Sequence, residues 1–149
     1  MKIFKTSPRL VFLINHKVYK FFKSDIECKN EAEKINSSPM LELYDNVSKY
    51  KMKFVKILEV GDNFYIMEQS KGECLSIFNS TEDYKLAGCW LKCFHNLTFN
   101  NEDKKAFLFG DFTASHLYID HEHKEINTID PGTGFGIIGE IEIDISRFF

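Results

Sequence analysis

Residues 109–120 read Phe109-Gly-Asp-Phe-Thr-Ala-Ser-His-Leu-Tyr-Ile-Asp120, and Glu125-Ile-Asn-Thr-Ile-Asp-Pro-Gly132 follows after a short turn. The apolar runs on either side of that turn predict a β-hairpin. Asp111 lies before the hairpin and Asp130 ends it, so the hairpin would bring two carboxylates together. In phosphoryl transfer one acid can orient or deprotonate the acceptor hydroxyl, while another holds the metal that bridges the nucleotide phosphates. This stretch therefore favours phosphoryl transfer.

The sequence before residue 70 predicts a small sheet with one helix. Apolar and aromatic runs predict two hairpins, Leu10–Ile14 with Val18–Phe22, turning at Asn15-His16, and Lys53–Val60 with Asn63–Glu68, turning at Gly61-Asp62. Between them, Ser24 or Asp25 can cap a helix that runs to about Ser37.

A long amphipathic helix is expected over roughly residues 82–97. Leu86, Trp90, Phe94 and Leu97 recur at helical spacing, and Ser80-Thr-Glu-Asp83 before them has the form of a capping box. A polar loop, the hairpin described above and a glycine-rich loop at residues 131–139 follow. This order of elements is α+β rather than alternating β-α units.

Residues 109–132 resemble the catalytic and metal-binding loops of small-molecule kinases within the protein-kinase-like superfamily. The aminoglycoside phosphotransferase, choline kinase and lipopolysaccharide-core kinase families carry a His-Gly-Asp segment, an Asn five residues beyond the Asp, a short hairpin and an Ile-Asp-Phe-Gly-like ending. The resemblance implies that Asp111 is the catalytic base and that Asp130 is the main metal ligand, with Gly110 at the family glycine.

Two positions depart from the family pattern. Phe109 replaces a His whose role in the family is mainly structural, and His116 stands where the family has Asn. Mg²⁺ prefers oxygen ligands, and an imidazole nitrogen is a poorer ligand for it. The resemblance therefore implies that His116 is a metal ligand in a site that is altered or has reduced activity.

The first half of the chain resembles the nucleotide-binding lobe of the same families. Lys20 matches the strand lysine that contacts the α- and β-phosphates of ATP. Glu27, Glu31 and Glu33 compete for the role of its glutamate partner, and Glu31 is chosen because it borders the inward-facing stripe of the helix.

The segment at Met67, Glu68 and Gln69 resembles the hinge of the same families, whose backbone groups meet the adenine. Leu86–Asn96 is similar to the family's long helix before the catalytic loop. Ile143–Phe148 is similar to a helix start in which an aspartate, here Asp144, braces that loop.

Two family features are missing. No glycine precedes Gly61, so the Lys5-Thr-Ser-Pro8 turn would have to cover the phosphates with its hydroxyls and backbone N–H groups. The chain also stops where the family continues into further helices. We therefore expect a reduced acceptor site, or one completed by a partner protein or a second copy of the chain.

The resemblance implies a minimal two-lobed kinase-like domain over residues 1–149. Residues 1–68 would form the N-lobe and residues 69–149 a reduced, mainly helical C-lobe. The expected activity is an ATP-dependent phosphotransferase that uses ATP with Mg²⁺ or Mn²⁺ and acts on a small-molecule or sugar hydroxyl. The alternative is a pseudokinase, a nucleotide-binding or scaffolding module with little turnover, because fold alone does not fix function.

Composition excludes other classes of protein. The net charge of −3 argues against a general nucleic-acid binder, which needs a basic face. The four cysteines match neither a zinc ribbon nor a disulfide framework, and Cys89 and Cys93 are expected as reduced core residues. With no signal peptide at the start and no apolar run long enough to span a membrane, we expect a cytoplasmic protein.

Plainer interpretations stay open for the same residues. Asp111 and Asp130 are also typical turn and cap residues. Lys20 and Glu31 could be solvated side chains, and His116 could serve packing alone. His95, near a helix end, is expected to complement the helix dipole.

Two other patterns carry no site in our interpretation. His121 and His123 lie beside acidic residues, but the tight turn predicted there would direct their side chains into water. Residues 134–139 satisfy Gly-x-Gly-x-x-Gly, yet a dinucleotide-binding fold would need a further helix, strand and acid in the ten residues that remain.

Overall fold

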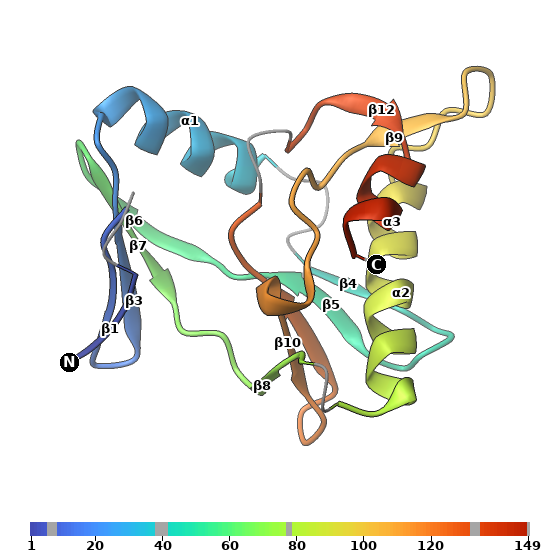
Figure 1. The fold of residues 1–149 in the computed structure, drawn as a ribbon, viewed down its shortest axis with the longest axis horizontal. Coiled ribbons are helices and arrows are strands. Elements are labelled where there is room, and N and C mark those ends of the chain that lie inside the picture. The colour runs from blue at the N-terminus through green and yellow to red at the C-terminus, as the bar shows by residue number, and fades with distance from the viewer. Residues whose placement is uncertain (6–8, 38–41, 77–78, 132–134, 149) are drawn as a thin grey trace. The chain divides into compact units, whose positions relative to one another are not determined.

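The chain forms two compact units that alternate along the sequence. A computed structural model describes residues 1–5, 9–37, 42–76, 79–131 and 135–148. The first unit comprises Met1–Leu41 with Val55–Gln69, and the second comprises Glu42–Phe54 with Ser70–Phe149. Figure 1 labels their helices and strands. Both units combine strands with helices, so the predicted α+β class is confirmed.

The first unit is a five-stranded antiparallel sheet with one helix among its described residues. Its strands lie in the order β1-β2-β3-β7-β6, with bounds β1 (Lys2–Lys5), β2 (Val11–Ile14), β3 (Lys17–Phe21), β6 (Ile57–Val60) and β7 (Phe64–Glu68). Asn15 and His16 close the β2–β3 hairpin with φ of 49° and 59°, the left-handed values that a type I′ turn requires. The N-terminal sheet and this hairpin agree with the sequence prediction.

The helix of the first unit, α1 (Asp25–Asn36), also lies where the sequence predicts it. Ser24 caps it by accepting a backbone N–H of the first turn at 3.2 Å. Its buried residues Cys28, Ala32 and Ile35 recur every three or four positions, and this stripe packs against β6 and β7. Glu31 follows Cys28 by three positions and therefore borders the same stripe.

The second unit contains two sheets as well as helices. The larger sheet has the order β4-β5-β11-β10-β8, with bounds β4 (Glu42–Tyr44), β5 (Lys51–Phe54), β8 (Glu73–Cys74), β10 (Leu117–Asp120) and β11 (Glu125–Thr128). The other elements are β9 (Lys105–Phe107), β12 (Ile138–Glu140), α2 (Thr81–Asn96), the 3-10 turn η1 (Ala114–His116) and α3 (Glu142–Phe148). The described residues of 69–149 form two α-helices, one 3-10 turn and five short strands, so the part expected as a mainly helical C-terminal lobe combines both kinds of element.

Residues 53–60 do not form the single predicted strand. β5 ends at Phe54 and β6 begins at Ile57, so the segment divides between the two units. β5 pairs in parallel with β11, with Lys51 opposite Glu125. This long-range pairing groups residues 42–54 with the second unit, whereas the sequence had placed them in an N-lobe of residues 1–68. The β6–β7 hairpin itself lies where it was predicted.

The helix α2 follows the predicted pattern closely. Ser80 and Asp83 form the expected capping box, and Leu86, Trp90 and Phe94 are buried. No helix in the described ranges is both long and apolar enough to cross a membrane.

Cys89 and Cys93, expected in the core, are only half-buried on α2 and form no disulfide. Burial, followed by the nearby charge of Asp45, raises the pKa of Cys93 to about 11. Cys93 is therefore almost entirely protonated at neutral pH, which makes it a poor nucleophile.

An aromatic cluster forms the core of the second unit. Phe109 is fully buried, stacks on Phe54 with ring centroids 5.6 Å apart, and meets the edge of Trp90 at 5.6 Å. Such ring pairs contribute about 0.5–1.5 kcal/mol beyond their buried area. Phe109 therefore serves packing, and it anchors the start of the loop that carries Asp111.

Candidate functional site

Lys20 and Glu31 form a buried ion pair inside the first unit. Lys20 lies on β3 and is only 2% exposed, and its Nζ lies 2.7 Å from Oε1 of Glu31 on α1. Glu31 also accepts a hydrogen bond from the hydroxyl of Tyr65 at 2.8 Å. The predicted choice of Glu31 over Glu27 and Glu33 as the partner of Lys20 is confirmed by this contact.

A third ionic member, Arg9, was not predicted from the sequence. Its guanidinium donates to Oε2 of Glu31 at 2.7 Å and lies over the ring of Phe22 at 4.6 Å from the centroid. Arg9, Lys20 and Glu31 together carry one net positive charge, because two cations share one carboxylate. Such a cluster can bind an anionic group such as a phosphate without losing its internal ion pairs. No sequence signal marks Arg9, since it matches no motif position.

The predicted adenine-binding segment, Met67, Glu68 and Gln69, lies at the end of β7. The N–H of Glu68 donates to the carbonyl of Lys56 at 3.0 Å, and that of Gln69 donates to the carbonyl of His16 at 3.3 Å. These two amides are therefore already engaged inside the first unit. A purine at this segment would have to use other backbone groups or displace the longer of the two bonds.

The loop that carries Asp111 is fixed by a buried carboxylate in the second unit. Asp144, on α3, is fully buried and accepts the N–H of Phe109 at 2.7 Å and the N–H of Gly110 at 2.9 Å. Gly110 has a φ of 89°, a conformation that a side chain would oppose. The expectation that Asp144 braces this loop is confirmed.

His95 completes this brace. It is 4% exposed, and its Nε2 lies 2.9 Å from Oδ2 of Asp144. A carboxylate only accepts, so the imidazole N–H donates here. Three donors thus offset the cost of burying the carboxylate of Asp144, which is high for an unpaired charge. The sequence analysis assigned His95 to the helix dipole and missed this contact, although His95 and Asp144 were each singled out.

Asp111 itself faces solvent, with half of its side-chain surface exposed. The backbone carbonyl of Asp111 accepts a hydrogen bond from Nδ1 of His116 at 2.9 Å. A carbonyl cannot donate, so the proton of the neutral imidazole lies on Nδ1, and Nε2 keeps a lone pair for a ligand. The distance from the same Nδ1 to Oδ2 of Asp111 is 3.8 Å, too long for a hydrogen bond.

Asp130 lies at the open end of the β10–β11 hairpin, the end to which His116 also belongs. Leu117 pairs with Thr128 in the ladder, and the N–H of Ile129 donates to the carbonyl of His116 at 3.0 Å. Asp130 follows with a φ of 51°, a left-handed value that is rare outside glycine and that Asp and Asn tolerate best. These bonds bring Asp111, His116 and Asp130 to one end of the hairpin.

This trio would hold a divalent cation only with help from other ligands. The described residues contain no group of three or more His, Cys, Asp or Glu side chains arranged to bind a metal. Mg²⁺ bound with a nucleotide commonly takes one or two protein carboxylates and completes its shell with phosphate oxygens and water. Asp130 and Nε2 of His116 fit that mode. The Lys5–Pro8 turn expected to cover the phosphates falls largely outside the described residues.

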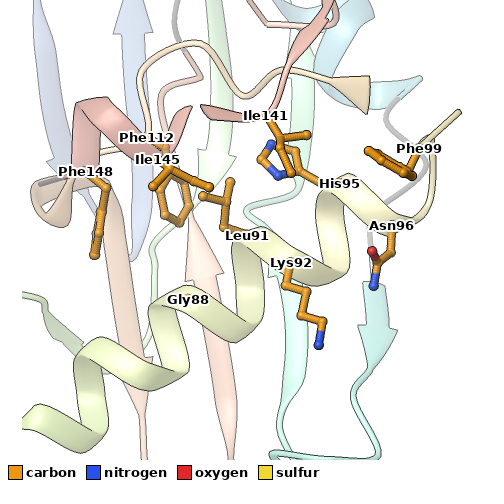
Figure 2. A pocket seen from close by; sticks show the side chains of 10 residues that line it. All are labelled: Gly88, Leu91, Lys92, His95, Asn96, Phe99, Phe112, Ile141, Ile145 and Phe148. Carbon is orange, nitrogen blue, oxygen red and sulfur yellow. The ribbon is translucent and has the colours of Figure 1, made fainter. Parts of the chain in front are cut away.

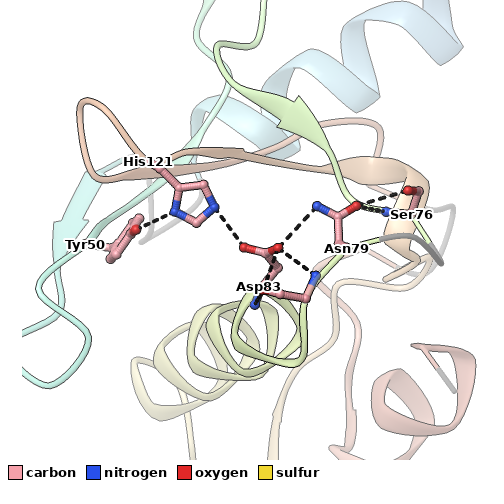
Figure 3. Close-up of polar contacts among 6 residues, drawn as sticks. Tyr50, Ser76, Asn79, Asp83 and His121 are labelled. Carbon is pink, nitrogen blue, oxygen red and sulfur yellow. Dashed lines mark hydrogen bonds and ion pairs between the residues drawn. The ribbon is translucent and has the colours of Figure 1, made fainter.

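The histidines of the β10–β11 turn pair with carboxylates. His123 Nδ1 lies 2.8 Å from Oδ2 of Asp120, and His121 contacts both Tyr50 and Asp83 (Figure 3). Both imidazoles are more than half exposed, as the predicted turn implies.

Asp83 is the centre of the contacts in Figure 3. Burial acts to raise its pKa, but hydrogen bonds from the side chain and backbone of Ser80 and from Asn79, with the charge of His121, hold it below the usual value. The Nε2 of His121 lies 2.8 Å from Oδ1 of Asp83, yet that oxygen receives no hydrogen bond of acceptable geometry. The contact is therefore an ion pair only when the imidazole is protonated.

Similarity to known proteins adds no assignment to this geometry. The contacts around Lys20 and around Asp111 are properties of this chain's own residues. No protein-family model matches the sequence, and no curated protein is significantly similar to it.

Proposed function

We propose that the protein is an ATP-dependent phosphotransferase that acts on the hydroxyl of a small molecule or sugar. Lys20, held by Glu31, would bind the nucleotide phosphates, and Asp130 with His116 would hold the divalent metal. Asp111 would orient the acceptor hydroxyl for in-line attack and accept its proton.

The main support for this proposal is that the buried carboxylate of Asp144 holds the backbone directly before Asp111 in place. A catalytic carboxylate must be held in place while remaining open to substrate, because misplacement by about 1 Å can cost 100-fold in rate. Asp144 binds the two amides that precede Asp111, while the side chain of Asp111 stays half exposed. A surface aspartate in an ordinary turn needs no such buried support.

The ion cluster of the first unit gives independent support. A lysine that is 2% exposed loses most of its hydration, and burial of this kind is costly unless the charge is paired. Arg9 adds a second cation beside Glu31, and a quarter of its side chain is exposed. A guanidinium in that position can contact a phosphate group.

A divalent cation held by Asp130 and His116 would supply positive charge to offset the negative charge that develops during transfer. His116 would determine which metal this site prefers. Its Nδ1–H is fixed on the carbonyl of Asp111, which orients Nε2 in the way that metal-bound histidines are commonly oriented by a second hydrogen bond. Imidazole suits Mn²⁺ better than Mg²⁺, so Mn²⁺ is the cation that we expect to support binding best.

The alternative function is a pseudokinase that binds nucleotide without turnover. The engaged amides of Glu68 and Gln69 favour it, since they reduce the backbone groups that an adenine could use. Binding and turnover must therefore be measured separately.

The test is a titration of ATP with Mn²⁺ or Mg²⁺, read by melting temperature and then by nucleotide consumption with candidate acceptors. Ligand at 100 times its Kd stabilises a protein by about 2.7 kcal/mol, which is readily measured. Lys20→Met should abolish the shift, and Lys17→Met, an exposed lysine on the same strand, is the matched control. No shift with either metal at millimolar nucleotide contradicts the proposal, and a shift without turnover favours the pseudokinase.

A further inference from the structure

An apolar pocket of about 400 Å³ lies in the second unit between α2 and α3. Most of its wall consists of large apolar side chains, namely Leu91, Phe99, Phe112, Ile141, Ile145 and Phe148. Figure 2 shows the α3 side chains facing those of α2. Pockets that take small molecules typically measure ~300–1,000 Å³ and are lined mainly by such residues.

Gly88 explains why this space stays open. It lies within α2 and lines the pocket, and a Cβ built at this position would meet no atom within 4 Å. A glycine inside a helix is unfavourable relative to alanine. The sequence thus places the least favourable non-proline residue at a helix position where a larger side chain would extend into open space at the pocket.

The polar residues of the lining indicate the charge of an occupant. Lys92 is its cation, His95 and Asn96 are the other polar members, and none of the lining residues is acidic. In Figure 2 the polar ends of Lys92 and Asn96 point away from the apolar group, so they mark an edge of the pocket. A ligand matching this arrangement has an apolar body and an anionic end.

We propose that this pocket binds a small amphiphile of that class, such as a medium-chain carboxylate, with its chain against α3 and its charge near Lys92. This site is separate from the proposed nucleotide site and does not depend on it. It goes beyond the phosphotransferase proposal because it assigns a second ligand.

An occupant would contact two residues that bear on the loop of Asp111. Phe112 directly follows Asp111 in the chain and lines the pocket. His95 also lines it and donates to Asp144, the residue that holds the amides of Phe109 and Gly110. Binding should therefore be visible at the loop.

The experiment is a titration with dodecanoate, below its micelle concentration and without nucleotide, by calorimetry and by amide NMR. We expect saturable 1:1 binding, with shifts at Leu91, Phe112 and Ile145. Gly88→Leu should weaken it at least tenfold by filling the space, whereas Gly88→Ala should bind within about threefold of the wild type. Since a charge-assisted contact is worth about tenfold or more, Lys92→Glu should also weaken binding by at least tenfold.

Two controls distinguish charge-dependent binding in the pocket from non-specific hydrophobic binding. Lys71→Glu makes the same charge change at an exposed lysine outside the pocket and should leave the affinity unchanged. Dodecyltrimethylammonium has the same chain with the opposite charge and should bind at least tenfold more weakly.

Two results with the wild-type protein overturn the proposal: equal affinity for the two amphiphiles, and NMR shifts confined to residues outside the pocket. Both results can be obtained even if Gly88→Leu does not fold. Absence of saturable binding overturns it as well. Dimerisation that Gly88→Leu abolishes, seen by light scattering, would assign the pocket to a second copy of the chain instead.

Discussion

His116 donates its Nδ1–H to the backbone carbonyl of Asp111 at 2.9 Å, so the candidate metal ligand and the candidate catalytic base are joined by one hydrogen bond. Loss of the imidazole at His116 would therefore remove a bond that fixes the backbone of Asp111. An asparagine at position 116, as in the small-molecule kinases that this loop resembles, could present a carbonyl oxygen to the metal. Its shorter side chain could not at the same time donate to the carbonyl of Asp111 as the imidazole does.

The first prediction concerns metal preference. His116→Asn replaces a nitrogen ligand with an amide oxygen, so nucleotide binding should shift from Mn²⁺ toward Mg²⁺. The ratio of ATP affinities with the two metals measures this shift. His123→Asn, at an exposed histidine in the turn at the opposite end of the same hairpin, is the control and should leave the ratio unchanged. An unchanged ratio in His116→Asn means that His116 serves packing and is not a ligand.

The second prediction concerns the buried brace. Asp144→Ala would leave His95 and the amides of Phe109 and Gly110 without their acceptor. Breaking a buried charged contact in this way costs about 3–5 kcal/mol, and urea unfolding measures the loss. Glu122→Gln, at an exposed acid of the second unit, should change the free energy of unfolding by less than about 0.5 kcal/mol. A loss below about 1 kcal/mol for Asp144→Ala would show that the brace is not needed.

The third prediction concerns pH and Asp83. Its pKa is lower in the folded protein than in the unfolded chain, so its contribution to stability is complete above the unfolded value of about 3.9. That contribution is lost as the pH falls through the lower, folded pKa. Asp83→Asn should therefore cost about 1 kcal/mol at pH 7 and clearly less at pH 3, by urea unfolding at both values. A cost that is the same at both pH values argues that the charge of Asp83 is unimportant.

The fourth prediction compares two glycines. Gly88→Ala should stabilise the protein by about 0.5–1 kcal/mol, because it removes a helical glycine and the new Cβ meets no atom within 4 Å. Gly61→Ala should destabilise it, since the new Cβ would clash with the ring of Phe64. Melting temperatures of both variants test the pair. A loss of stability in Gly88→Ala would mean that the space beside α2 is filled in solution.

Local sequence patterns predicted much of the secondary structure and little of the long-range pairing. The β2–β3 hairpin, α1 and the capping box of α2 follow from turn residues, caps and periodicity, which act over a few positions. The division of residues 53–60 could not be predicted in this way, because it depends on a partner strand that lies far along the chain. The strand β12 was missed because glycines around it favoured a loop.

The candidate site shows the same limit. The Lys20–Glu31 pair and the position of Asp144 were predicted because a family pattern specifies both members. Arg9 and the contact of His95 with Asp144 were not, since each joins residues that no spacing rule connects. Ion pairs of this kind become visible only when the fold places the two elements together.

The parallel pairing of β5 with β11 has a consequence for the order of folding. The β5–β11 ladder, in which Lys51 lies opposite Glu125, can form only after both distant segments of the chain are present. The other neighbour of β5, the antiparallel strand β4, is only three residues long. Contacts between such distant positions slow folding, since the intervening chain loses entropy before the pairing stabilises it. The first unit must also form from two segments that are separated by β4 and β5. During synthesis, β5 will therefore leave the ribosome long before its neighbour β11, and in that interval it offers an unpaired strand edge to other chains.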